Sequence, residues 1–277
     1  MSSIVLDHVR MVYPGRDGGV LALNDISLSV EEGQFGAIVG ASGCGKSTLL
    51  NIVGGLVTPT GGEVRLDNQP IDGPGADRGM VFQSYTLYPW KSVRRNIEFG
   101  LALRHVPKER RRAVTDELIA QVGLEGFADA YPKALSGGMK QRVAIARALA
   151  NDPRVLLMDE PFGALDAQTR VVMQELLLDI WERSRKTVLF VTHDIDEAIL
   201  LSDVVYVLSS RPGTLRLRLP IDLDRPRSLD TMGTPRFAAF KRQILEIIHR
   251  ESLREAGLAN RLGAGRPAAV EGDSQAG

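Results

Sequence analysis

The sequence predicts an α/β fold in which a parallel sheet is joined by an antiparallel β layer and a helical insertion. Continuous apolar runs at Val155 to Met158 and Thr187 to Val191 enclose a helical segment, as expected of buried parallel strands in a βαβ unit. Ile4 to Leu6 and Ala22 to Val30 alternate in the manner of paired strands and predict the antiparallel layer. The charged segment from Lys108 to Val122 has Val114, Leu118 and Ile119 at the spacing of a helix face, which predicts a helical insertion.

The other core elements follow in order along the chain. Phe35 to Val39 is a short apolar strand that runs through a glycine-rich turn into a helix at Ser47 to Val53. A second helix of the insertion covers Ser136 to Leu149, so that the insertion extends over about residues 90–150. The helix between the two buried strands covers Asp166 to Arg183.

The pattern changes near residue 210. Val204 to Leu208 is the last predicted strand, and residues 1–210 are expected to form the main domain. Residues 211–277 are expected to form a C-terminal extension with one amphipathic helix near Phe237 to Leu253. The end of the chain, from Gly263, is rich in glycine and alanine and is expected to be disordered.

Charge and composition limit the classes of function. The chain of 277 residues holds 34 Lys and Arg against 34 Asp and Glu, and 15 aromatic residues. It therefore lacks the basic field and the stacking platform of nucleic-acid-binding proteins, and no nucleic-acid partner is expected. With a single cysteine, Cys44, and no run near the roughly 18 apolar residues that cross a bilayer, we expect a cytosolic protein whose membrane role is peripheral.

A phosphate-binding loop is predicted where the first core strand meets its helix. The pattern G-x-x-x-x-G-K-[ST] is formed by Gly40, Ala41, Ser42, Gly43, Cys44, Gly45, Lys46 and Ser47, with Thr48 next. In such a loop, backbone N–H groups point at phosphate oxygens and the helix dipole adds its positive end. Lys46 would reach the β and γ phosphates of ATP, Ser47 would bind Mg²⁺, and Thr48 would hold a phosphate oxygen or cap the helix. A glycine-rich turn before an ordinary helix is the alternative.

Two carboxylates end the strand at Val155 to Met158, and together with the loop they predict a P-loop NTPase (RecA-like) core. Asp159 would hold Mg²⁺ through water, and Glu160 would polarise the attacking water. Alone, an Asp-Glu pair before Pro161 could equally be a surface turn. With the phosphate loop present, the pair predicts an ATP-hydrolysing enzyme.

A second phosphate-binding element opens the helix at Ser136. Ser136 can cap the helix, while Gly137 and Gly138 expose backbone N–H groups at the positive end of its dipole. One nucleotide does not need two such elements from one chain, so this one is expected to serve a second copy of the protein. At this stretch, Leu135 to Arg142 (LSGGMKQR), the sequence resembles the ATP-binding subunits of ABC transporters, over about residues 4–210 and in six motifs in the same order.

The resemblance implies a head-to-tail homodimer. In that family each ATP lies between the phosphate loop of one subunit and the signature helix of the other. Ser136, Gly137 and Gly138 would then face the γ-phosphate bound by the second copy, and Ala164 to Asp166 would join the two sites. An N-cap is the alternative role for Asp166.

Three further residues take roles from the resemblance. Tyr13 would stack on adenine, Gln83 would contact Mg²⁺ and water, and His193 would hold the γ-phosphate. The structural alternatives are a surface aromatic for Tyr13, a strand-end polar group for Gln83 and a structural histidine for His193.

The resemblance also implies a bacterial importer as the machine that ATP drives. A subunit without a membrane span would dock onto two transmembrane permease subunits at the cytoplasmic face of the inner membrane. A periplasmic or lipid-anchored solute-binding protein would be an indirect partner. The aromatic loop at Ser84 to Trp90 is expected to grip a helix of a permease subunit, unless it forms a packed turn.

The solute class is suggested by three stretches that look like the importer subfamily for nitrate, sulfonates and taurine: Tyr88 to Trp90, Pro161 to Asp166 and Ser210 to Gly213. They imply uptake of a small anionic solute. Lys91 and Gln168 depart from the family pattern, in which apolar residues are more frequent. An importer of sugars, polyamines or thiamine precursors, and a soluble ATP-dependent switch or DNA-repair ATPase, remain the alternatives.

Overall fold

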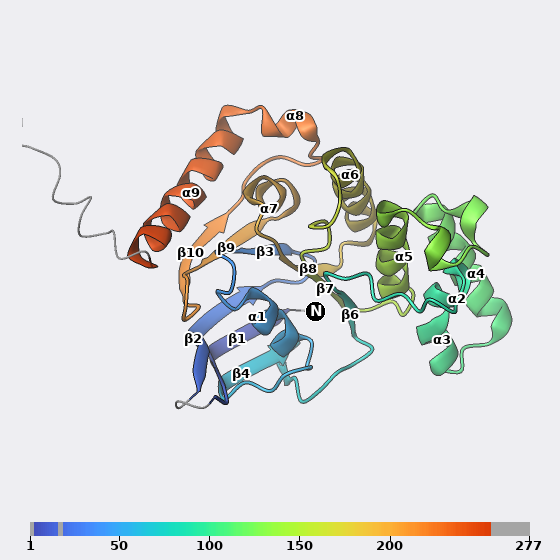
Figure 1. Cartoon of the computed structure of the whole chain (residues 1–277), viewed down its shortest axis with the longest axis horizontal. Coiled ribbons are helices and arrows are strands. Elements are labelled where there is room, and N and C mark those ends of the chain that lie inside the picture. The colour runs from blue at the N-terminus through green and yellow to red at the C-terminus, as the bar shows by residue number, and fades with distance from the viewer. Residues whose placement is uncertain (1–2, 16–18, 256–277) are drawn as a thin grey trace, which may run out of the picture.

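Six strands form the central sheet of the molecule, in the order β10-β9-β3-β8-β7-β6 (Figure 1). The structure is a computed structural model that describes residues 3–15 and 19–255. Strands β6, β7, β8, β3 and β9 run parallel, and β10 pairs antiparallel with β9. The strands are β3 (Phe35–Val39), β6 (Arg78–Val81), β7 (Val155–Asp159), β8 (Thr187–Val191), β9 (Val204–Leu208) and β10 (Leu215–Pro220). The carboxyl ends of β3, β6, β7 and β8 therefore share one edge, where ligands bind in sheets of this type.

A smaller antiparallel sheet lies against one face of the central sheet, with helix α1 between them (Figure 1). Its order is β2-β1-β4-β5, built from β1 (Ile4–Tyr13), β2 (Val20–Val30), β4 (Gly61–Leu66) and β5 (Gln69–Pro70). Buried residues alternate along β1 and β2 except at a register shift between the two strands, and they share one core cluster with the buried residues of α1 (Lys46–Val53).

The other face of the central sheet is covered by the helices α6 (Ala167–Ser184), α7 (Ile195–Leu201) and α9 (Pro235–Glu255), and the short α8 (Leu229–Met232) leads into α9 (Figure 1). An aromatic cluster holds this layer on the sheet. Trp181 of α6 packs edge-on against Phe35 of β3, with ring centroids 5.8 Å apart, and Phe35 also packs against Phe190 of β8 at 5.7 Å.

The helical insertion lies beside β6 at the edge of the sheet (Figure 1). It contains α2 (Val93–Ile97), α3 (Phe99–Leu103), α4 (Lys108–Gln121) and α5 (Gly137–Leu149). Buried Asn96 orders the chain that leads into the insertion. Its side chain accepts from the N–H of Tyr88 at 2.8 Å and donates to the carbonyl oxygens of Lys91 and Ser92 at 2.9 and 3.0 Å.

The strands and helices that the sequence predicts are present. Their ends lie within a few residues of the expected ones except in β1, which continues seven residues beyond the predicted Leu6, to Tyr13. The structure differs from the expectation most after residue 210. Besides the expected helix, which runs over Pro235–Glu255, the segment contributes α8 and β10, and β10 joins the central sheet. Phe237 and Ile244 of α9 are buried in the same core as the sheet, so this part of the segment packs as part of the main body. The predicted disordered end and residues 16–18 lie outside the described residues.

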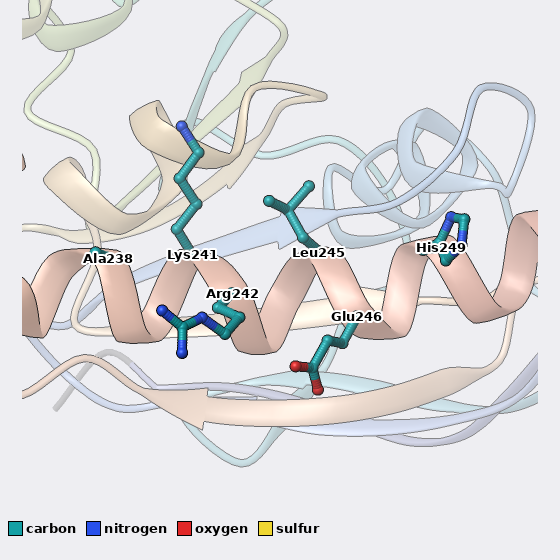
Figure 2. Close-up of a pocket in the computed structure, with 6 residues that line it drawn as sticks. All are labelled: Ala238, Lys241, Arg242, Leu245, Glu246 and His249. Carbon is teal, nitrogen blue, oxygen red and sulfur yellow. The ribbon is translucent and has the colours of Figure 1, made fainter. Parts of the chain in front are cut away.

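Helix α9 also carries a pocket of about 410 Å³ on its surface, away from the strand ends described above (Figure 2). Its lining residues are Ala238, Lys241, Arg242, Leu245, Glu246 and His249. Lys241 points towards α7, where its Nζ donates to Asp196 Oδ2 at 2.8 Å. Over residues 3–15 and 19–255, none of the helices combines the length and the apolar composition that crossing a bilayer requires.

Candidate nucleotide site

The glycine-rich loop connects β3 to α1 at the shared edge of the sheet. Gly43 and Gly45 have φ angles of 76° and 96°, in the left-handed region that side chains disfavour. A Cβ atom at Gly45 would also lie 2.6 Å from Leu23 Cδ2, so the loop packs closely on β2. The loop thus turns the chain directly into the amino end of α1, where free N–H groups and the helix dipole favour an anion.

Lys46 occupies the centre of the site. Its side chain is 5% exposed, and its Nζ donates to the carbonyl oxygens of Gly40 and Ala41 at 3.0 and 3.2 Å. Glu160 Oε1 lies 3.8 Å from the same nitrogen. The ammonium group is therefore held inside the loop, next to the carboxylates at the end of β7.

Asp159 and Ser47 meet across the site, as their predicted positions require. Ser47 Oγ donates to Asp159 Oδ1 at 3.0 Å, although 112 residues separate them along the chain. Burial raises the pKa of Asp159, and the hydrogen bond from Ser47 opposes that shift. Hydroxyl and carboxylate oxygens thus lie side by side where the loop and β7 end.

Glu160 and His193 form a second pair beside the first. The His193 ring, which follows β8, places Nδ1 3.1 Å from Glu160 Oε2. Glu160 adopts a φ of 42°, uncommon for a residue with a side chain, and its N–H donates to the carbonyl of Val191 at 2.8 Å. Strained backbone of this kind concentrates at functional sites because the surrounding structure must hold it in place.

Gln83, Tyr13 and Thr48 border the same region. Gln83 follows β6 and lines, together with Lys46, Ser47, Thr48 and Glu160, a pocket of about 320 Å³. Tyr13 ends β1 and is 37% exposed, and its hydroxyl donates to Thr48 Oγ1 at 3.3 Å. Its ring thus stands at the rim of the site on the antiparallel sheet.

Cys44 lies beneath the loop and is fully buried. A Cβ atom at Gly40 would lie 2.8 Å from its Sγ, so the thiol fills the space under the turn. Burial raises the pKa of the Cys44 thiol. The residue therefore supports the loop from below.

Ser136, Gly137 and Gly138 begin helix α5 in the insertion, and none of them lines the pocket around Lys46. Ser136 caps the helix, accepting from the N–H of Met139 at 3.3 Å. A Cβ atom at Gly138 would lie 2.5 Å from Thr169 Cγ2, so the glycine allows α5 to approach α6 closely. The two phosphate-binding elements that the sequence predicts are thus separate within one chain.

Asp166 caps helix α6. Its Oδ1 accepts from the N–H of Thr169 at 2.9 Å, and this hydrogen bond lowers the pKa of the Asp166 carboxyl. The capping alternative that the sequence left open is therefore present in the structure.

Arg211 contacts the phosphate loop, although the sequence predicted no role for it at this site and marked it only as part of a subfamily motif. Its Nε donates to the carbonyl of Gly43 at 3.4 Å, and its guanidinium covers the space where a Cβ at Gly43 would stand. Gly213 brings the segment onto the loop by exchanging backbone hydrogen bonds with Ala22 and Asn24 at 2.9 Å. No spacing rule connects residues 43 and 211, so the sequence carried no signal for this contact.

A phosphate loop and a pair of strand-end carboxylates, on a parallel sheet with an antiparallel β layer, define the molecule as a P-loop ATPase of the cassette type. A family model described as ABC transporter matches residues 23–163. The nitrate import ATP-binding protein NrtD of Synechocystis sp. is 54% identical over 215 residues, 78% of this chain and 81% of that protein. The bicarbonate transport ATP-binding protein CmpC of Synechococcus elongatus is 46% identical over 253 residues, 90% of this chain and 38% of that protein.

Among solved structures, the ATP-binding cassette MJ0796, in a dimeric post-hydrolysis state bound to ADP and Pi, matches with a TM-score of 0.71 at 36% identity. The match covers 80% of this chain and 100% of that one. The chain therefore belongs to the ABC transporter ATP-binding family, and it is an ABC ATPase that binds ATP and hydrolyses it for transport.

Proposed function

We propose that this ATPase is the energising subunit of an importer for a small anion of the nitrate, bicarbonate, sulfonate or taurine class. The observation that carries the ATPase part is the meeting of Ser47 with Asp159 and of Glu160 with His193, beside Lys46. The solute class is supported by the names of the nitrate and bicarbonate relatives, which share about half of their aligned residues with this chain.

Lys46 is proposed to bind the β and γ phosphates of ATP together with the N–H groups of residues 40–48. Its current acceptors are two neutral carbonyl oxygens, and phosphate oxygens are stronger acceptors for an ammonium group. Tyr13 is proposed to stack on the adenine ring from the rim of the site, where its exposed ring leaves a face available.

Ser47, Asp159 and Gln83 are proposed to hold Mg²⁺. The residues fit this ion, since a hydroxyl and a carboxylate oxygen lie 3.0 Å apart and an amide side chain lines the same pocket. Mg²⁺, when bound, neutralises charge on the phosphates of ATP.

Glu160 is proposed to polarise the attacking water, and His193 to hold the γ-phosphate. The contact of His193 Nδ1 with Glu160 orients the ring, so that Nε2 is the nitrogen left to face a phosphate. Phosphoryl transfer to water needs positioning and charge neutralisation rather than a covalent intermediate, which these residues can supply.

A head-to-tail homodimer is proposed to complete each site. Within one chain Ser136, Gly137 and Gly138 stand apart from the pocket around Lys46, and the dimeric state of the MJ0796 cassette supports pairing of two copies. Asp166 and its neighbours Ala164 and Leu165 are proposed to connect the two sites. ATP binding would close the dimer and hydrolysis would reopen it.

In each copy of the proposed dimer, a groove of about 540 Å³ between β6, α3 and α5 is proposed to receive one helix from one of the two permease subunits. Tyr88 lines it and packs on Phe99, with ring centroids 4.5 Å apart. Arg147 holds its rim through hydrogen bonds to Thr86 at 2.7 and 2.8 Å, and Trp90 beside it is 69% exposed. The exposed ring and the open groove favour docking of a partner over a packed turn. Docking would hold the chain at the cytoplasmic face of the membrane. A solute-binding protein on the opposite side of the membrane would be an indirect partner.

The docking proposal is tested by co-purification with the permease subunits encoded near this gene. Trp90→Asp should lower their recovery severalfold, because a charge replaces the exposed aromatic ring. Phe127→Asp is the matched control, since Phe127 is 46% exposed elsewhere in the insertion. Equal recovery of the permease with both variants would contradict the docking surface.

The solute is tested by growth of a strain that lacks this gene. The solute would be identified by loss of growth on nitrate as the sole nitrogen source, on taurine or another sulfonate as the sole sulfur source, or at low bicarbonate. The wild-type gene should restore growth. Growth defects confined to sugars, polyamines or thiamine precursors would contradict the anion class. DNA-stimulated ATP turnover without a permease would favour a soluble switch or a repair ATPase.

A further inference from the structure

One arginine of helix α6 links two loops that meet at the nucleotide site. Arg170 lies in the first turns of α6, four residues after the cap at Asp166. Its Nη2 donates to the carbonyl oxygen of Leu165 at 3.2 Å, and its Nη1 pairs with Asp194 Oδ2 at 3.4 Å. Both charged side chains are about one-third exposed, at 31% and 32%. A planar guanidinium can hold two acceptors at once in a defined geometry.

Asp194 uses its two carboxylate oxygens for different partners. Oδ1 caps helix α7 and accepts from the N–H groups of Asp196 and Glu197 at 2.9 and 3.2 Å, while Oδ2 faces Arg170. Its own N–H donates to Thr192 Oγ1 at 3.0 Å. Because His193 lies between these hydrogen-bonded neighbours, its backbone is held by the same cap.

A second polar link joins α6 to α7 deeper in the protein. Gln174, one turn after Arg170, donates from Nε2 to Glu197 Oε1 at 3.1 Å, and both side chains are buried. Glu197 is also hydrogen-bonded by the side chain of Thr192. We call this set of residues the α6–α7 seam: Arg170, Gln174, Thr192, Asp194 and Glu197.

The seam borders the catalytic pair. A small cavity of about 10 Å³ is lined by Glu160 and His193 together with Arg170, Asp194 and Glu197 of the seam. Such a volume is at the lower limit for about one water molecule. The hydrogen bonds of Arg170 go to Leu165 and Asp194 rather than to Glu160 or His193, so we treat it as a positioning residue.

We propose that Arg170 positions His193 against Glu160, and that the position of the Leu165–Asp166 segment controls this placement. The inference rests on the proposed roles of Glu160 and His193 and on the proposed contact of Leu165–Asp166 with the second copy. Movement of the Leu165 carbonyl shifts the guanidinium, which pulls Asp194 and the start of α7 with it. Closure of the dimer is in this way transmitted to the side chain that faces the γ-phosphate.

The first test separates turnover from nucleotide binding. Arg170→Ala should lower kcat about 10- to 100-fold, the size expected when a catalytic group is misplaced by about 1 Å. Its KM for ATP and its affinity for a non-hydrolysable ATP analogue should change less than about twofold, since no phosphate contact is lost. Arg170→Lys should recover part of kcat, because an ammonium group reaches one acceptor but not both.

Arg183→Ala is the matched control on the same helix. Arg183 is 67% exposed and pairs with Asp179 on the surface of α6, so its removal should leave kcat unchanged. Melting temperatures of all variants show whether a loss of kcat accompanies a loss of fold.

The second test is a double-mutant cycle. Asp194→Asn keeps an oxygen that can cap α7 but loses the charge that faces Arg170. The double variant with Arg170→Ala should lose no more turnover than the more impaired single variant. If Arg170→Ala does not fold, Arg170→Lys and Asp194→Asn provide the same comparison.

Three results would overturn the inference: wild-type kcat in Arg170→Ala, losses that multiply in the double variant, or an equal fall in kcat and in analogue affinity. Glu160→Gln distinguishes these from failure of the proposed function. If Glu160→Gln abolishes turnover and Arg170→Ala leaves it unchanged, only the positioning role fails; if Glu160→Gln turns over at the wild-type rate, the proposed site itself fails.

Discussion

At the scale of single residues, the site depends on a buried cation held among carboxylates and carbonyl groups. Lys46 is 5% exposed, and its ammonium has two carbonyl acceptors and the nearby Glu160. A buried charge is tolerated only when such partners surround it. The position suits a side chain that exchanges these neutral acceptors for phosphate oxygens when ATP binds.

Lys46→Ala should weaken ATP binding, because a charge-assisted hydrogen bond to phosphate is lost. The expected fall in affinity is about 10- to 150-fold, which corresponds to roughly 1.5–3 kcal/mol. Binding of a fluorescent ATP analogue measures it, with Lys108→Ala at the exposed start of α4 as the control. Equal affinity of Lys46→Ala and the control would contradict the phosphate-loop assignment.

At the scale of elements, Arg227 fixes the carboxyl end of helix α7 to the segment that follows β10. Its guanidinium is 5% exposed and donates to the carbonyl oxygens of Ile199 and Ser202 on one side and of Ile221 and Leu223 on the other. Burial lowers the pKa of Arg227 to about 10, but at neutral pH the group remains charged. The last carbonyls of a helix otherwise lack partners, so this arginine supplies them.

Arg227→Met should destabilise the protein by about 3–5 kcal/mol, because several buried carbonyl groups lose their donor together. Urea unfolding measures the change in the free energy of unfolding. Arg236→Met is the control, since Arg236 is exposed and pairs with Asp222 on the surface. If Arg227→Met lowers the free energy of unfolding no more than the control does, water must replace the arginine as hydrogen-bond donor to these carbonyl groups.

Glu197 of the α6–α7 seam carries a stability cost that depends on pH. Burial raises the pKa of its carboxyl above the ordinary value of 4.5. Hydrogen bonds from Thr192 and Gln174 oppose this rise. The nearby charge of Asp194 raises the pKa further, and that of Arg170 lowers it. A carboxyl with a higher pKa in the fold binds its proton more tightly there. Its contribution to stability is therefore lost as the pH rises from about 4.5 through the raised pKa.

Glu197→Gln should remove this dependence while keeping an oxygen for the same hydrogen bonds. The free energy of unfolding of the variant, relative to wild type, should rise as the pH increases through that range. Urea unfolding at a series of pH values measures it, with Glu175→Gln at an exposed position of the neighbouring helix α6 as the control. If the free energies of unfolding of Glu197→Gln and wild type change with pH in parallel, burial of the Glu197 carboxyl does not reduce stability.

Local signals made several elements predictable from the sequence. Ser136 and Asp166 carry the residue types that cap helices, and both caps are formed. Continuous apolar runs identified β3, β7 and β8 because a strand buried on both faces needs no polar positions. The meeting of Ser47 with Asp159 followed from the rule that the carboxyl ends of parallel strands share an edge.

Other elements could not be predicted, since tertiary partners define them. Strand β6 has four residues, among them Arg78 and Gly79, and is a strand because β7 pairs with it. Strand β10 alternates Leu and Arg at the edge of the sheet, and its pairing with β9 assigns it to the core. Arg227 and Arg170 act through carbonyl and carboxylate groups from distant segments, which no spacing rule connects.

At the scale of the whole molecule, the central claim is that two copies of this chain close on ATP and that Glu160 drives its hydrolysis. The separation of the Ser136 helix from the pocket around Lys46 is the structural reason to expect the second copy. In the proposed dimer, coupling between the copies would pass through the Leu165–Asp166 segment and the α6–α7 seam. Pairing and hydrolysis can thus be examined in one variant.

The most direct measurement uses purified Glu160→Gln with ATP and Mg²⁺, followed by light scattering and by phosphate release. We predict a complex of twice the 30.2 kDa mass of one chain, because the variant binds ATP but cannot reopen the dimer. Phosphate release should fall about 100-fold or more below wild type, as expected when a preorganised catalytic group is lost. A variant that stays monomeric with ATP bound, or that releases phosphate at the wild-type rate, would contradict the account.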